Sequence, residues 1–283
     1  MAYPVPAPGS CHRQPARQVQ PAAPVIPSQT PHLCEGSSLV TAGRGVGPGT
    51  HEEADVVRVW LIRHGQSESN AGLPSADWRG IPLTGLGHQQ AQRIAEVFAD
   101  PPKLIVRSPY LRAQQTAQPT IARYPGAACE EWPVQEFSYL RTLDGRATTS
   151  HERAPEVRAY WEQAEPQHAE PGAESFAGLL GRVTSFLGRL GAQQAGPVAV
   201  FTHGIFMRAV AWHLLTGVAD PGPEDMRQFR RFTSLYPVPN GGVLELRYYP
   251  GESAPSLIGG TTLQLPASLA PQDPDERRSV SLT

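Results

Sequence analysis

The sequence predicts an α/β protein whose sheet is largely parallel, with an antiparallel element late in the chain. Three apolar runs of strand length support this prediction: VVRVWLI at 56–62, KLIVR at 103–107 and PVAVFT at 197–202. Each run is followed by residues with helical periodicity or a helix-capping signal. Because ligands bind beyond the carboxyl ends of the strands in such sheets, the residues that follow these runs are the first candidates for a functional site.

Spacing and capping residues predict a helix after each of the first two strands. Thr84 is a suitable N-cap for the first helix, in which apolar side chains recur at i, i+3, i+4 and i+7 from Ala91. Ser108 is expected to cap the second helix, and Pro109 is expected to take its first helical position. Arg112 then lies in the first turns of that helix, near the carboxyl end of the preceding strand.

The later part of the chain continues to alternate between predicted helices and predicted strands. Helical patterns are predicted at 155–165, 174–190 and 205–215. The segment EEWPVQEF at 130–137 is expected to be extended, with Pro133 indicating a sheet edge or a bulge. Segments 228–236 and 243–249 flank PNGG, which is typical of a hairpin turn, so we expect the domain to close with an antiparallel hairpin.

The composition of the 283-residue chain divides it into a folded centre and two tails. Residues 1–55 hold nine prolines and a single aromatic, Tyr3, so they bury too little apolar surface to offset the entropy of ordering. Residues 251–283 hold four prolines and no aromatic residue. Both tails are therefore predicted to be disordered, and 56–250 is predicted to form one domain.

Charge and cysteine content exclude several classes of function. The net charge of −2 provides no field that would recruit nucleic acid or an anionic membrane. Cys11, Cys34 and Cys129 are odd in number and lack the spacing of a disulfide framework or a zinc site. The sequence has neither a signal-peptide pattern at its start nor an apolar run approaching ~18 residues. We therefore expect a soluble, cytoplasmic protein.

Polar residues that suit an anion follow the predicted strands. Arg63 and His64 stand side by side at the end of the first strand, where each must stay solvated or find a counter-charge. His203 ends the strand VAVFT, and Arg112 follows the second strand. Glu136 is an isolated acid in VQEFSYL. Taken together, these residues predict a site for an anionic group at the carboxyl edge of the sheet.

The ordered set RHG, SPYLRAQQTA, VQEFSYL and FTHG resembles the histidine phosphatase superfamily, also called phosphoglycerate mutase-like, over essentially all of 56–250. The resemblance implies a three-layer α/β/α sandwich with a mostly parallel central sheet. It implies that His64 is the nucleophile and that Glu136, three residues before Tyr139, is the proton donor. Glu130 and Glu131 remain alternatives for the acid because they lie close by in the sequence.

The resemblance also implies which groups bind phosphate, and it implies no metal or cofactor. The residues implied to surround the phosphoryl group are Arg63, Arg112, His203, Gln66, Asn70 and Gly204. Glu174 and Arg182 match a helix pattern of the family, although a surface salt bridge explains them equally well. The expected ligand is a small phosphorylated molecule, with no nucleic acid or membrane partner, and the oligomeric state is left open.

These residue types fit phosphoryl transfer on chemical grounds. Imidazole, with an ordinary pKa of ~6.5, is a neutral nucleophile that can approach a phosphorus shielded by negative oxygens. Arginine binds phosphate oxygens through a planar fork, and Arg63, Arg112 and a protonated His203 would neutralise the charge without a metal ion. Glu136 would protonate the leaving oxygen and then activate the water that releases phosphate from a phosphohistidine.

Three activities fit this set of residues. The sequence FSYLRTLDG after the acid departs from the mutase pattern Glu-Arg-His-Tyr-Gly, and Phe137 favours a less charged leaving group, so we favour a metal-independent phosphatase. Arg141 and Arg146 are nevertheless candidates for meeting a second anionic group. A cofactor-dependent mutase-type phosphotransferase is the first alternative. A catalytically silent protein that binds a phosphorylated ligand or a partner is the second.

Overall fold

The computed structural model describes residues 55–98, 100–140, 146–194 and 196–261, and every structural statement below concerns these residues. The predictions for 1–54 and 262–283, and for Arg141, lie outside them. Among the described helices, none is both long and apolar enough to cross a membrane.

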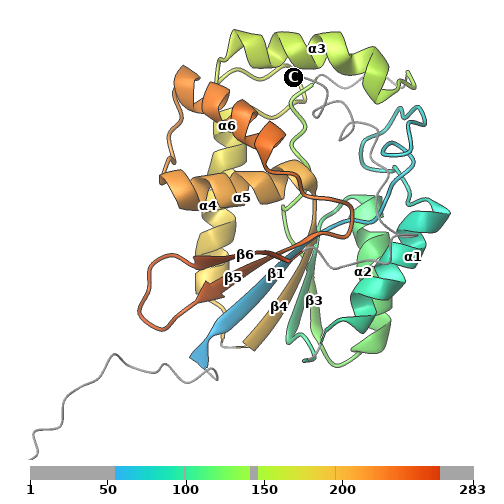
Figure 1. Cartoon of the computed structure of the whole chain (residues 1–283), viewed down its shortest axis with the longest axis vertical. Coiled ribbons are helices and arrows are strands. Elements are labelled where there is room, and N and C mark those ends of the chain that lie inside the picture. Colours follow the sequence, from blue (N-terminus) through green and yellow to red (C-terminus); the bar gives the residue numbers. More distant parts are fainter. Residues whose placement is uncertain (1–54, 99, 141–145, 195, 262–283) are drawn as a thin grey trace, which may run out of the picture. The chain divides into compact units, whose positions relative to one another are not determined.

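A six-stranded mixed sheet forms the centre of the domain, in the order β3-β2-β4-β1-β5-β6 (Figure 1). The strands are β1 (Val57–Arg63), β2 (Leu104–Arg107), β3 (Ala128–Glu131), β4 (Gly196–Thr202), β5 (Val243–Tyr248) and β6 (Ser256–Thr261). The first four strands pair in parallel, whereas β5 runs antiparallel to both β1 and β6. The predicted parallel sheet with a late antiparallel element is therefore confirmed.

Helices cover both faces of the sheet, which gives the three layers that the resemblance implies (Figure 1). The helices are α1 (Gly85–Glu96), α2 (Leu111–Arg123), α3 (Ser150–Gln163), α4 (Phe176–Gly191), α5 (Gly204–Thr216) and α6 (Pro223–Leu235). Side chains alternate between the two faces of a strand. Accordingly Val59 and Leu61 pack with the larger core under α4 and α5, while Ile62 packs with Ile94 of α1 in the smaller core.

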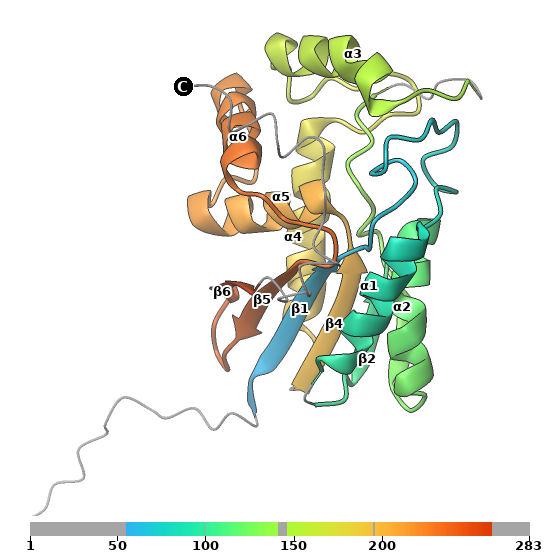
Figure 2. The same cartoon turned by 45° about the vertical axis from the view of Figure 1, so that its right-hand side comes forward.

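The register of the parallel strands brings three connections together at one edge. Arg63 at the end of β1 pairs with Thr202 at the end of β4, and Arg107 at the end of β2 pairs with Phe201. The residues that come next, at 64, 108 and 203, therefore emerge side by side. In both Figure 1 and Figure 2, α3 lies beyond this carboxyl edge of the sheet.

The predicted closing hairpin is wrong in its first strand. Residues 228–235 belong to α6, which starts with Pro223 in its first turn and with a bond from Gly222 N–H to the Asp225 carboxylate (2.8 Å). Met226 and Phe229, three residues apart, are its buried side chains, which is helical spacing. The partner of β5 is instead β6, which lies inside the segment predicted to be a disordered tail from residue 251.

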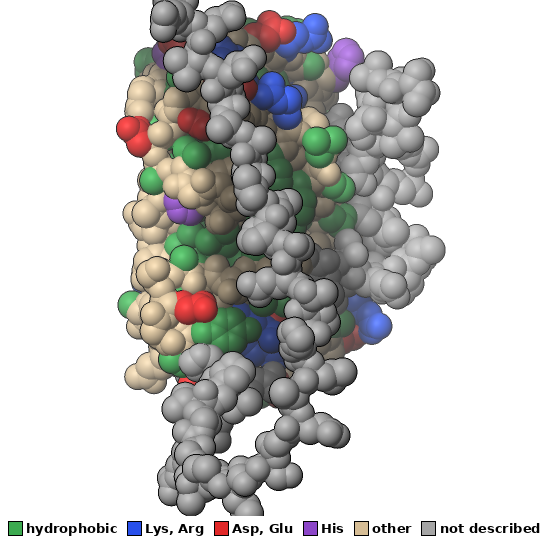
Figure 3. Space-filling model, turned by 60° about the vertical axis from the view of Figure 1, so that its left-hand side comes forward, with side chains coloured by type: hydrophobic (Ala, Val, Ile, Leu, Met, Phe, Trp, Pro, Cys, Tyr) green, Lys and Arg blue, Asp and Glu red, His purple; other side chains and the backbone are tan. Residues whose placement is uncertain are grey.

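Surface charge on one face of the domain is dispersed. Figure 3 shows acidic and basic side chains in small groups among hydrophobic and neutral ones, without a broad field of either sign on the visible part of that face. This distribution fits the small net charge of −2.

Candidate active site

His64 lies at the carboxyl end of β1, where its ring is held in one tautomer. Its Nδ1 lies 2.7 Å from the carbonyl oxygen of Gly65, and Arg112 donates from Nε to its Nε2 at 3.2 Å. Because a carbonyl only accepts and a guanidinium only donates, Nδ1 carries the proton and Nε2 carries the lone pair. The nitrogen that faces Arg112 is thus the one able to act as a nucleophile.

The surroundings of His64 favour its neutral form. The side chain is 3 % exposed, and burial lowers its pKa well below the ordinary value of 6.5. The positive charges of Arg112 and then Arg63 lower the pKa further, while the bond to the Gly65 carbonyl acts in the opposite direction. At neutral pH the imidazole is therefore uncharged, as an attack on an anionic phosphoryl group requires.

His203 is the N-cap residue of α5 and faces His64, with the two ring centroids 5.1 Å apart. Its Nε2 lies 2.8 Å from the hydroxyl of Ser108. Its Nδ1 is buried and has no hydrogen-bond partner in the part of the chain that the structure describes. A buried ring nitrogen without a partner, next to the ring of His64, marks a position where a ligand atom can be bound.

The environment of His203 favours its neutral form, and its protonation around a bound phosphoryl group stays a prediction. Burial lowers the pKa of His203 well below 6.5, and Arg112 and His64 lower it further. His203 is therefore neutral at neutral pH. The sequence did not predict this because the effect comes from arginines and burial contributed by distant segments.

Arg112 and Arg63 supply the fixed positive charge. Arg112 is 6 % exposed and donates from Nη1 to the carbonyl oxygen of Trp78 at 2.7 Å. Burial lowers the pKa of Arg112 to about 10, with Glu136 acting in the opposite direction, so the guanidinium stays charged at neutral pH. Arg63 donates from Nη1 to the carbonyl oxygen of Val238, and its Nε lies beside Gly204 at the start of α5.

Glu136 reaches the same site through the N-terminus of α5. Its Oε1 accepts from the backbone N–H of Ile205 (3.1 Å) and of Phe137 (3.1 Å). Glu136 also acts electrostatically on Arg112. The alternative acids, Glu130 and Glu131, lie elsewhere, on the exposed strand β3. Glu130 pairs with Arg189 (2.7 Å), and Glu131 accepts from Gln114 (3.3 Å). Of the three acids, Glu136 is the one that the fold brings to the histidines.

The loop after β1 uses its polar side chains largely for its own structure. Gln66 Oε1 accepts from the hydroxyl of Thr84, the N-cap of α1, at 2.8 Å. Asn70 Oδ1 accepts from Ser67 Oγ at 3.0 Å and from Asn240 Nδ2 at 3.1 Å. These two oxygens hold the loop, and the contact of Gln66 and Asn70 with phosphate that the resemblance implies stays a prediction.

Glycine occupies two positions at the site for different physical reasons. A Cβ added to Gly65 would stand 2.5 Å from the carbonyl oxygen of Gly87, so only glycine allows α1 to approach the loop this closely. Gly204 is the first residue of α5, and its N–H has no acceptor among the described residues. Free N–H groups at the start of a helix favour an anion, so Gly204 is suited to the role that the sequence predicts.

Ser108 belongs to the site, and not to the helix cap that the sequence predicted. Helix α2 begins at Leu111 with Tyr110 as its N-cap residue, whose side chain does not cap the helix. Ser108 Oγ instead accepts from Tyr110 N–H at 3.2 Å and bonds to His203. Its position directly after a strand could have indicated a site residue. Serine is also a common N-cap residue, however, and that role was the one predicted.

Asn240 was not predicted as a site residue, because PNGG was interpreted as a hairpin turn. The side chain is 2 % exposed, and its Nδ2 donates to the His64 carbonyl oxygen and to Asn70 Oδ1, both at 3.1 Å. The segment around Asn240 therefore braces the loop that carries His64.

Arg182 and Glu174 form more than a surface salt bridge. Arg182 Nε and Nη2 bind the two oxygens of Glu174, each at 2.7 Å. Its Nη1 donates to the carbonyl oxygens of Pro133 (3.0 Å) and Gln135 (2.9 Å). The pair thus anchors the backbone immediately before Glu136.

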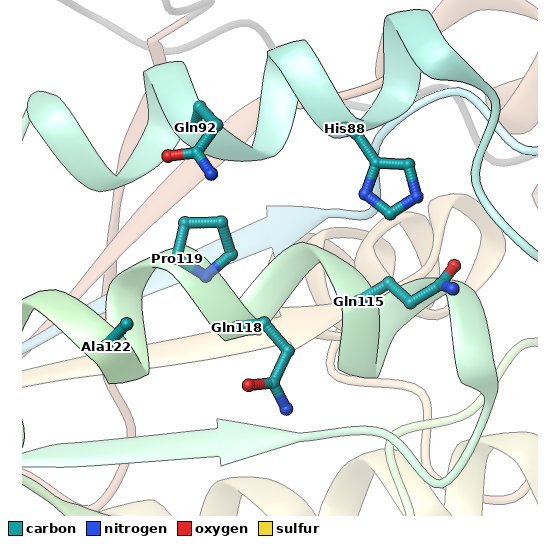
Figure 4. Close-up of a pocket in the computed structure, with 6 residues that line it drawn as sticks. All are labelled: His88, Gln92, Gln115, Gln118, Pro119 and Ala122. Carbon is teal, nitrogen blue, oxygen red and sulfur yellow. The ribbon is translucent and has the colours of Figure 1, made fainter.

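Two further features concern metal binding and the surface between α1 and α2. Among the described residues, no group of three or more His, Cys, Asp and Glu side chains could hold a metal ion. A shallow groove runs between α1 and α2 (Figure 4), and neither His64 nor His203 lines it. The groove is lined by His88, Gln92, Gln115, Gln118, Pro119 and Ala122.

Comparison with known proteins shows the family of the chain. The sequence profile of the histidine phosphatase superfamily (branch 1) matches residues 59–255. The chain belongs to this family. The predicted family resemblance is thereby confirmed.

Relatives within the family share moderate identity with the chain. Glucosyl-3-phosphoglycerate phosphatase from Mycolicibacterium vanbaalenii is 31% identical over 178 residues, which cover 59% of this chain and 78% of that protein. Phosphoglycerate mutase-like protein 4 from Arabidopsis thaliana is 28% identical over 169 residues, or 56% of this chain and 71% of that protein.

Solved structures show the same fold. A mycobacterial glucosyl-3-phosphoglycerate phosphatase is 24% identical with a TM-score of 0.52, covering 68% of this chain and 90% of that one. A phosphoserine phosphatase mutant from Entamoeba histolytica, in complex with phosphoserine, is 20% identical with a TM-score of 0.54 and covers 74% and 98%. At this identity the likeness concerns the fold alone.

Proposed function

We propose that the protein is a phosphatase that hydrolyses a phosphomonoester through a phosphohistidine on His64, without a metal ion. The observation that carries this proposal is the unprotonated Nε2 of a buried, neutral His64, which faces the guanidinium of Arg112 at 3.2 Å. A neutral nucleophile beside fixed positive charge suits an attack on a dianionic phosphoryl group.

In the first step a phosphoryl group binds among Arg112, Arg63, His203 and the free N–H of Gly204. Arg112 Nε exchanges its bond to His64 for a phosphate oxygen, which frees the Nε2 lone pair. Nε2 attacks phosphorus, the bond from phosphorus to the ester oxygen breaks, and Glu136 gives its proton to that oxygen. In the second step water attacks the phosphohistidine while Glu136 takes its proton, and phosphate leaves.

Two arguments favour hydrolysis over the alternatives. The relatives named as phosphatases include the protein that is 31% identical, and the sequence after the acid, FSYLRTLDG, departs from the mutase pattern. The silent alternative has less support because His64, Arg112, Glu136 and His203 are all present and lie together.

Rapid quench with a ³²P-labelled phosphomonoester tests the proposal. Wild-type protein is expected to form a labelled species whose P–N bond is acid-labile and base-stable, and to release inorganic phosphate after exhaustive chelation. His64→Ala should give no label. His88→Ala, an exposed histidine on α1, is the matched control and should behave as wild type.

Glu136→Gln separates the two steps. It should still accept the phosphoryl group from a nitrophenyl ester, whose leaving group is a weak base, but it should fail on an alkyl ester and release phosphate slowly. Label that persists in His64→Ala would overturn the assignment of the nucleophile. Transfer of the label to a hydroxy acid in place of water would favour the mutase alternative.

A further inference from the structure

The two ring nitrogens of His203 have different surroundings. Its Nε2 lies 2.8 Å from the hydroxyl oxygen of Ser108, whereas its Nδ1 is buried and has no hydrogen-bond partner among the described residues. In a neutral imidazole one nitrogen carries the proton and the other carries a lone pair. The nitrogen that carries the proton decides whether His203 offers a ligand a donor or an acceptor at Nδ1.

The hydrogen bonds of Ser108 select between these two tautomers. Tyr110 donates from its backbone N–H to Ser108 Oγ at 3.2 Å, and this bond uses a lone pair of the oxygen. The acceptor that the described residues offer to the hydroxyl proton is Nε2 of His203. A buried hydroxyl proton without an acceptor is unfavourable, so Ser108 donates to Nε2. The proton of the His203 ring then lies on Nδ1.

Neighbouring segments hold Ser108 and the His203 ring in this arrangement. Ser108 is fully buried, and its backbone N–H donates to the carbonyl oxygen of Phe201 at 3.0 Å, two residues before His203. The ring of Tyr110 makes a T-shaped contact with the ring of His203, with the centroids 5.3 Å apart. The Tyr110 hydroxyl is itself held by Ser138 Oγ at 2.8 Å. The hydroxyl of Ser108 is therefore kept beside Nε2 by groups of the fold, which makes it preorganised.

The two histidines of the site consequently present opposite groups. His64 holds its proton on Nδ1, toward the Gly65 carbonyl, and presents the lone pair of Nε2. His203 presents instead a buried Nδ1–H, for which the described part of the chain supplies no acceptor. Because the two ring centroids lie 5.1 Å apart, a phosphoryl group that is bonded to the first ring lies near the second. Its oxygens are acceptors that could satisfy this N–H.

We propose that Ser108 is a positioning residue, which fixes His203 in the Nδ1–H tautomer so that the neutral ring donates from Nδ1 to a phosphoryl oxygen. The part of the proposal that concerns phosphate rests on the proposed function, whereas the tautomer itself does not. In the opposite tautomer Nδ1 would turn a lone pair toward negative oxygens, which it would repel. Ser108 therefore acts on the ligand through His203.

Nitrogen-15 NMR of the imidazole rings tests the tautomer, because protonated and unprotonated ring nitrogens differ in chemical shift. His203→Gln assigns the signals by their loss. In wild-type protein at neutral pH, Nδ1 of His203 should be protonated and Nε2 unprotonated, both without ligand and with saturating inorganic phosphate. Ser108→Ala should populate the Nε2–H tautomer, and Ser108→Thr, which keeps the hydroxyl, should retain the wild-type pattern. Thr120→Val, which removes another fully buried hydroxyl from α2, is the matched control and should change nothing.

Calorimetry with inorganic phosphate tests the effect on binding without turnover. The apparent affinity of a ligand falls by the fraction of protein in the competent state, so the NMR populations predict the loss. If one ring in ten keeps the Nδ1–H tautomer in Ser108→Ala, phosphate should bind about 10-fold more weakly, and kcat/KM on nitrophenyl phosphate should fall by about the same factor. Ser108→Thr should recover most of this loss.

Several results would contradict the proposal. Wild-type His203 that is protonated on Nε2 alone, or on both nitrogens with phosphate bound, would overturn it even if no variant folded, and thermal unfolding shows which variants fold. A folded Ser108→Ala protein with an unchanged tautomer would remove the role of Ser108, and a shifted tautomer with unchanged phosphate affinity would remove the role of the Nδ1–H. Failure of wild type to hydrolyse nitrophenyl phosphate would instead overturn the proposed function, while the NMR and phosphate-binding results would still decide the role of Ser108.

Discussion

At the scale of single residues, three different influences prepare the His64 imidazole. The Gly65 carbonyl selects the tautomer by accepting from Nδ1 at 2.7 Å. Burial disfavours the charged ring, and the charge of Arg112 disfavours it further. The same arginine that would bind the phosphoryl group therefore also keeps the His64 ring uncharged.

Arg112→Gln should accordingly change the titration of His64. Because the positive charge of Arg112 lowers the pKa of His64, its removal should raise that pKa and move the acid limb of activity to higher pH. The variant should also lose about 10²–10³-fold in rate, as for loss of one preorganised donor. NMR titration of the His64 ring, together with the pH profile of kcat/KM on nitrophenyl phosphate, measures both effects.

Arg123→Gln is the matched control for this experiment, since Arg123 is exposed in the last turn of the same helix. It should leave the titration and the rate unchanged. A His64 pKa that is unmoved or lowered in Arg112→Gln would contradict the electrostatic account of this pair.

At the scale of secondary-structure elements, the site is assembled from the ends of strands and from the start of one helix. His64, Ser108 and His203 directly follow β1, β2 and β4, whose register places them together. Glu136 arrives from the segment after β3 and accepts from the N–H of Ile205 in the first turn of α5. That segment has little regular structure of its own, so its position depends on side chains from other elements.

Arg182→Gln should loosen the segment that carries Glu136. The side chains of Arg182 and Glu174 are 11% and 21% exposed, so breaking the pair leaves a partly buried carboxylate without its partner. We expect a loss of about 2–3 kcal/mol in the free energy of unfolding. We also expect a lower kcat on alkyl esters, because Glu136 would no longer be held at the leaving oxygen. Urea denaturation and steady-state kinetics measure the two effects.

Arg189→Gln serves as the comparison on the same helix. Arg189 pairs with Glu130 at 2.7 Å, but both side chains are about half exposed, so its loss should cost about 0–1 kcal/mol and leave kcat unchanged. Equal effects of the two substitutions would show that the pair of Arg182 and Glu174 contributes no more than an ordinary surface salt bridge.

At the scale of the whole domain, the sheet extends further than the composition suggests. Strand β6 pairs antiparallel with β5, and Leu257 packs against the larger core. The antiparallel pair closes the side of the sheet next to β1, whose end carries His64. The last strand therefore extends the sheet on the side of β1 away from β4.

Two fragments test the boundary of the functional unit. Residues 55–261 should keep the activity of the full chain towards nitrophenyl phosphate. Residues 55–250 should be less stable in urea by about 2 kcal/mol or more, because β5 loses its hydrogen-bonded neighbour and the larger core loses Leu257. If the shorter fragment were as stable as the longer one, β6 would not be part of the folding unit. Loss of activity in a 55–261 fragment that folds cooperatively would show that residues outside it are needed.

Much of the fold and of the candidate site is predictable because its signals are local. The apolar runs define β1, β2 and β4, and the Thr84 cap defines α1 within a few residues of sequence. The motifs RHG and FTHG follow their strands directly, so they indicate which edge of the sheet carries His64 and His203. Family membership follows from the order of these motifs, which needs no tertiary information.

The tertiary structure alone decided the features that depend on segments far apart in the chain. Asn240 contacts the carbonyl of a residue 176 positions away, and Arg182 contacts backbone 47 and 49 positions away. The neutral state of His203 likewise arises from burial and from Arg112, not from its neighbours in sequence. Local patterns determine where a strand or helix begins, whereas charge state and contacts at the site depend on which distant groups the packing brings within a few ångströms.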